Sequence, residues 1–157
     1  MTECSAEQLE FHGLGKRVVV GRFDGGAISS DGGALLLSEV EAKTGILAGL
    51  AEQFIDHRNP ELIDHSAREL IAQRVLAVAL GWEDLNDHDR LRCDPLLATA
   101  VGKCDPSGQD RSKEQDRGKA LASSSTLNRL ELTPPDADSA ARYKKIVADP
   151  EGIDRLM

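Results

Sequence analysis

Acidic side chains gather between residues 84 and 94, where they could ligate a metal ion. The group consists of four carboxylates and one imidazole: Asp84, Asp87, His88, Asp89 and Asp94. Carboxylates beside a histidine suit Mg²⁺ or Mn²⁺. The aspartates also stand where short helices would begin, and there a carboxylate accepts hydrogen bonds from free backbone N–H groups. Capping explains the cluster without a metal, so we expect no metal site; a small metal-dependent enzyme is the alternative.

The segment from Ser123 to Arg129, which reads SSSTLNR, is the strongest candidate for a binding site. Small hydroxyl residues at a helix N-terminus can bind phosphate, and Asn and Arg one turn later can contact base edges. An ordinary capped helix with Arg129 in solvent explains the same residues. The DNA-binding hypothesis uses seven residues: Lys119, Ser123, Ser124, Ser125, Thr126, Asn128 and Arg129.

Other polar residues have simpler explanations. Asp24 and Asp31 border glycines and are expected to serve in a turn and at a helix cap. A possible basic face is interleaved with acids and is expected to be solvated; it comprises His57, Arg58, His65, Arg68 and Arg74.

The cysteines Cys4, Cys93 and Cys104 are odd in number and show no CxxC spacing, which indicates a reduced, cytoplasmic chain. The spacing of His88, Cys93 and Cys104 matches no known zinc-binding motif, so a structural zinc site is not expected.

Composition places the chain among globular proteins. Its 157 residues are 40% apolar and 29% charged, enough for one domain with a core. The net charge of −8 argues against tight nucleic-acid binding by the chain as a whole, although a local basic patch can override the sum. No apolar run approaches the ~18 residues that a membrane span requires.

The N-terminal third predicts a β-hairpin and a helix after a flexible arm at 1–17. Val18, Val19 and Val20 favour a strand, and a turn at 24–26 returns the chain, so the hairpin is expected at 18–30. In the helix that follows, from Ala34 to Lys43, apolar residues fall three and four apart. They predict a buried face formed by Leu36, Leu37 and Val40.

A helical bundle is expected over 34–101. Its longest helix runs from Glu61 to Leu80, after Asn59 as cap and Pro60 at the first position, and ends at Gly81. A shorter helix is expected at 46–54, and Asp94 starts another that ends near 101. Residues 102–120 lack periodicity and predict an exposed loop. Helices are expected within 123–148, the last over 138–147, and 149–157 begin another segment.

Four stretches in this order resemble a known family: FDGGAISSDGGALLLSEVE, FIDHRNPELIDHSARELIAQRV, ALGWEDLNDHDRLRCDPLLATAVGK and LASSSTLNRLE. They are similar to the N-terminal part of bacterial insertion-sequence transposases of the DDE type, in the group called transposase DDE domain group 1. The resemblance runs from Val18 to Glu131 and implies a role in DNA transposition.

The resemblance also implies chemistry that these residues do not supply. In the family, three carboxylates of an RNase H-like fold hold two Mg²⁺ or Mn²⁺ ions, which activate water or a 3′-hydroxyl for attack on phosphate. The first of those acids lies on a strand beyond the region represented here. We therefore assign no catalytic residue and expect an N-terminal transposase fragment, with its catalytic core missing, that is inactive alone.

These observations predict a mostly α fold with one N-terminal β-hairpin (α+β). The expected function is to bind or position transposon terminal inverted repeats, and the expected partners are DNA and a further copy of the chain or intact transposase. A truncated interaction protein, or an inert remnant, is the alternative. No membrane partner and no resident cofactor are expected.

Overall fold

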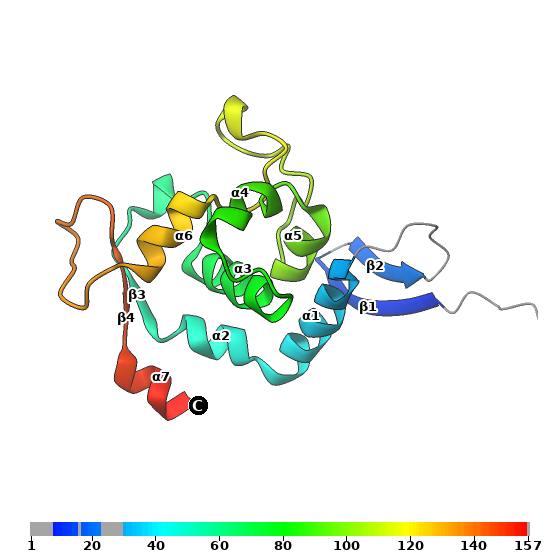
Figure 1. Ribbon diagram of the computed structural model, residues 1–157, viewed down its shortest axis with the longest axis horizontal. Helices are drawn as coiled ribbons and strands as arrows, with labels where there is room; N and C mark the ends of the chain where they lie inside the picture. The colour runs from blue at the N-terminus through cyan, green and yellow to red at the C-terminus, as the bar shows by residue number, and fades with distance from the viewer. Residues whose placement is uncertain (1–7, 16, 23–29, 157) are drawn as a thin grey trace, which may run out of the picture.

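The computed structural model describes residues 8–15, 17–22 and 30–156 (Figure 1). The strands are β1 (Gln8–Leu14), β2 (Arg17–Arg22), β3 (Phe54–Asp56) and β4 (Ile146–Ala148). The α-helices are α1 (Gly33–Thr44), α2 (Ile46–Ala51), α3 (Ala67–Ala79), α4 (His88–Leu91), α5 (Pro95–Val101), α6 (Ser124–Glu131) and α7 (Pro150–Leu156). The predicted class, mostly α with an N-terminal hairpin, is confirmed. None of the described helices is long and apolar enough to cross a membrane.

Helix α3 is the centre of the fold, with the other helices around it (Figure 1). Its C-terminal half buries Leu76 and Ala77 against α5 and Leu121. Its N-terminal half buries Leu70 and Ile71 against α6 and β4. Burial of each leucine or isoleucine contributes about 1.5–3 kcal/mol, and α3 packs against both α5 and α6.

Helix α3 begins later than the sequence predicts. Ser66 and Glu69 form a reciprocal capping box, in which the Glu69 N–H donates to Ser66 Oγ (3.2 Å) and the Ser66 N–H donates to Glu69 Oε2 (2.8 Å). Asn59 and Pro60 do start a helix, but it is a single 3-10 turn at Pro60–Leu62. Gly81 follows the helix with φ +95°, as a glycine terminator requires.

The hairpin lies upstream of its predicted place. β2 pairs with β1, with Phe11 opposite Val19, so residues 8–14 form a strand and the predicted arm at 1–17 is wrong for this part. The predicted turn at 24–26, and the return strand up to residue 29, lie outside the described residues. Ser30 begins a 3-10 turn (Ser30–Gly32). His12 joins the hairpin to α1, because its Nδ1 lies 2.8 Å from Glu39 Oε1.

Of the face that the apolar spacing predicts for α1, Leu37 packs against the core, whereas Leu36 and Val40 do not. Ala34 and Ser38 are buried, whereas Leu36 and Val40 are 59% and 52% exposed. Helix α1 packs against α5, and the Ser38 hydroxyl lies 3.5 Å from His12 Nε2 in the hairpin. The residue at the N-cap position of α1 is Gly32, which has no side chain to cap the helix, and the Oδ1 of Asp31 accepts a hydrogen bond from the Trp82 indole (3.2 Å).

A second small sheet replaces the predicted last helix at 138–147. Ile146 and Val147 are β-branched and buried, and β4 pairs antiparallel with β3, with Ile55 opposite Val147. The helix predicted at 46–54 correspondingly ends at Ala51. Asp138 caps only a turn, accepting from the N–H groups of Ala140 and Ala141 (2.8 and 3.2 Å).

Candidate nucleic-acid interface

Helix α6 is held to the core by one buried glutamine and two leucines. The Gln73 amide makes two hydrogen bonds to the backbone of Ala122, donating to its carbonyl (2.9 Å) and accepting from its N–H (2.9 Å). Leu127 and Leu130 are buried against α3 and β4. The opposite side of α6 exposes Ser125, Asn128 and Arg129, which fall three and four residues apart and therefore share one face. We refer to these three residues as the α6 face.

The N-terminus of α6 already holds an anion. Asp89 accepts hydrogen bonds from the Ser124 N–H (3.1 Å) and from the Ser124 hydroxyl (2.8 Å). These bonds, first that from the backbone N–H, lower the pKa of Asp89. A phosphate at this helix end would have to displace the carboxylate. The α6 face is therefore more accessible to DNA than the helix N-terminus.

The remaining predicted DNA-binding residues have other contacts. The Ser123 hydroxyl lies 3.0 Å from that of Ser125 and 3.2 Å from that of Thr126. Thr126 is half-buried. The Lys119 ammonium donates to the backbone oxygen of Gln115 (2.7 Å). Among the seven predicted residues, the structure thus leaves Asn128 and Arg129 most open to a ligand.

Sequence analysis missed a basic segment that lies against α6. The Arg129 guanidinium carbon is 5.2 Å from the centre of the Tyr143 ring, and that of Arg142 is 4.9 Å from it. The four residues 142–145 read RYKK, so the signal was present: three cations adjoin the only tyrosine of the chain. Residues 142–145 were assigned to the helix expected at 138–147 and were therefore not considered as a binding segment.

Positive charge is concentrated at this place. In the part of the chain that the structure describes, no ion pair involves Arg129, Arg142, Lys144 or Lys145. Arginines of the other predicted basic face are mostly neutralised: Arg58 pairs with Asp56 (2.7 Å), and Arg74 pairs with Glu131. The α6 face and residues 142–145 therefore form a local basic patch on a chain of net charge −8.

The acidic cluster caps helices, as predicted for Asp84 and Asp94. Asp84 accepts from the Asn86 N–H (2.8 Å), and Asp94 accepts from the N–H groups of Leu96 and Leu97 (2.7 and 3.2 Å). Each carboxylate serves a different backbone segment, so they do not converge.

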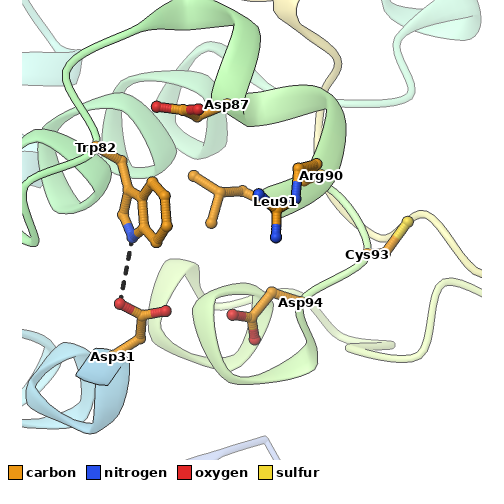
Figure 2. A pocket seen from close by; sticks show the side chains of 7 residues that line it. All are labelled: Asp31, Trp82, Asp87, Arg90, Leu91, Cys93 and Asp94. Atoms are coloured by element: carbon orange, nitrogen blue, oxygen red, sulfur yellow. Dashed lines mark hydrogen bonds between the residues drawn. The ribbon is translucent and has the colours of Figure 1, made fainter. Parts of the chain in front are cut away.

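The described residues do not form a binding site for a divalent metal ion. A cavity of about 280 Å³ is lined by Asp31, Asp87 and Asp94 with Trp82, Arg90, Leu91 and Cys93, and Figure 2 shows these carboxylates spaced around it. Among the described residues, no three His, Cys, Asp or Glu side chains lie where they could share a metal ion. His88 is buried beside Gln73, with its Nδ1 3.0 Å from the amide nitrogen. We therefore derive no step through Mg²⁺ or Mn²⁺.

Comparison with known families decides the assignment. The model of the family described as transposase DDE domain group 1 matches residues 11–151, nearly the whole chain. The chain belongs to this family. No curated protein and no solved structure shows a significant match to it. The match extends the four-block resemblance to β1 on one side and β4 on the other. For this transposase-family chain, a function related to transposition follows.

Proposed function

We propose that this transposase-family chain binds transposon-end DNA through the α6 face. The observation that carries the proposal is the placement of Ser125, Asn128 and Arg129 on the solvent side of a helix whose other side is buried. Asparagine can pair with the edge of adenine, and arginine with the edge of guanine, in the major groove, which admits an α-helix. Serine can donate to phosphate.

Electrostatics supports the same surface. DNA binding releases counterions in proportion to the phosphates neutralised, so it requires local cations rather than a basic chain. Arg129 and the three cations at 142–145 lie on this side and lack carboxylate partners in the described residues. The remaining surface of this acidic chain repels DNA. This repulsion favours encounters in which the basic patch faces the DNA.

The proposed binding mode uses the side of α6 rather than its N-terminus, because Asp89 occupies the Ser124 N–H. The terminal inverted repeat of the mobile element is the proposed partner. The proposal assigns DNA binding to the described residues and assigns strand cleavage to none of them.

Paired substitutions test the proposal. In a fluorescence anisotropy titration with a terminal-repeat duplex, we expect Asn128→Ala with Arg129→Ala to weaken binding roughly 10- to 100-fold, since a good base contact contributes about 1–3 kcal/mol. Removal of the Arg129 charge should also flatten the salt dependence.

Arg155→Ala is the matched control, because Arg155 lies exposed on α7, at the far end of β4 from residues 142–145. It removes one positive charge and is expected to leave affinity within about twofold. Unchanged affinity of the α6 double variant would refute the proposal, as would equal losses in the variant and in the control.

A further inference from the structure

Tyr143, the only tyrosine of the chain, lies on the surface rather than in the core. Tyr143 is 56% exposed, although the sequence contains just five aromatic residues. Two arginines from separate segments stack on its ring: Arg129 from α6 and Arg142 from the loop before β4. An exposed aromatic ring among unpaired cations has the features of a stacking platform for nucleobases.

Tyr143 lines two hollows in which a ligand could lie. Tyr143 lines a narrow cleft of about 70 Å³ together with Arg58, Thr126, Arg129 and Lys145. It also lines a wider hollow of about 470 Å³ in the 134–144 loop, where Asp136 and Asp138 accompany Arg142 and Lys144, so the narrow cleft is the more favourable side for a phosphate. The cleft is basic and partly walled by Leu70 and Ile146, so one side of the ring adjoins cations and apolar surface together.

We propose that Tyr143 stacks on a base of an unpaired DNA strand while Arg142 binds the flanking phosphate. A base within a duplex has both faces covered by its neighbours, so the base on Tyr143 must be unpaired. Stacking of a base on an aromatic ring is stronger than a cation–π contact at an exposed site. A base can therefore replace a guanidinium on the ring and leave that guanidinium free to pair with phosphate.

The inference rests on the proposed function, because Arg129 belongs both to the α6 face and to the Tyr143 site. With duplex on α6, the strand end would reach Tyr143 through this shared residue. The DNA partner inferred for this site is therefore a DNA end whose terminal nucleotides are single-stranded or frayed.

The test compares two probes: a blunt terminal-repeat duplex, and the same duplex with a short thymidine extension. The measured quantity is the ratio of their affinities for the intact chain. We expect the wild-type chain to prefer the extended probe by about tenfold, within the range that one stacked base provides. Tyr143→Phe, which keeps the ring, should retain this preference, and Tyr143→Ala should reduce the ratio to about one.

The outcomes separate the two proposals. Binding of the blunt duplex with a wild-type ratio of one overturns the Tyr143 inference alone. A preference that survives in Tyr143→Ala also overturns it. Absence of binding to both probes overturns the inference and the proposed function together. Tyr143→Phe guards against misfolding, since it preserves the packing of the ring and removes only the hydroxyl.

Discussion

Replacement of Gln73 with leucine is expected to destabilise the chain by about 3 kcal/mol, because two buried backbone groups lose their partners. Gln73 is buried, and its amide satisfies both the N–H and the carbonyl of Ala122. Leucine fills a similar volume but offers no hydrogen bond, so each orphaned group costs about 1–3 kcal/mol. His88 also loses its contact with the Gln73 amide. Urea denaturation followed by circular dichroism measures the loss.

Gln115→Leu is the matched control. It replaces the same amide with the same aliphatic side chain, but at an exposed position. It should alter the free energy of unfolding by no more than about 0.5 kcal/mol. Since Ala122 directly precedes Ser123, the N-cap residue of α6, hydrogen exchange in Gln73→Leu should rise most strongly at α6. Equal stability of the two variants would show that Gln73 does not anchor this helix.

Acidification is expected to weaken the fold through His65 before the carboxylates titrate. His65 is buried with Arg111 Nη1 2.7 Å from its Nε2 and Lys103 Nζ 3.4 Å from its Nδ1. Burial, followed by the charges of Arg111 and Lys103, lowers the pKa of His65 to about 4. Protonation therefore opposes the folded state.

The direction of the pH effect follows from proton binding. Between pH 6.5, the ordinary pKa of histidine, and about 4, the unfolded chain binds the proton and the folded chain does not. Stability from His65 is complete above this range and is lost as the pH falls through it, by about 3 kcal/mol in full and about 2 kcal/mol between about pH 7 and pH 5.

His65→Gln isolates this contribution, because glutamine can still accept a hydrogen bond from Arg111 but does not titrate. The variant should lose less stability than the wild-type chain between about pH 7 and pH 5, by about 2 kcal/mol. His88, whose pKa is also lowered by burial, remains in both proteins and cancels in the comparison. Identical pH dependence of unfolding would contradict the role of His65.

Local signals in the sequence identified much of the helical structure. Asp94 with Pro95 starts α5, and Gly81 follows the end of α3, because caps and terminators act within a few residues. The class and the family followed from the same local patterns. The predicted start of α3 failed because two cap signals, at Asn59 and Ser66, stand one after the other, and only the second begins the long helix.

Contacts between distant residues could not be predicted from these patterns. Gln73 and Ala122 are 49 residues apart, and Asp89 and Ser124 are 35 apart, so no local spacing marks either pair. Strand β4 depends on β3 for its hydrogen bonds, and three residues are too few to show alternation. The loop at 102–120 was expected to be exposed, yet Arg111 reaches the buried His65.

The most direct test of DNA binding through the α6 face is heteronuclear NMR of the intact chain titrated with the terminal-repeat duplex. Backbone amides of Ser125, Asn128 and Arg129 should show the largest shifts, followed by residues 142–145, and a scrambled duplex should produce smaller shifts at the same amides. Shifts centred on α1 or α7, or no change along α6 at a saturating DNA concentration, would contradict the proposed function.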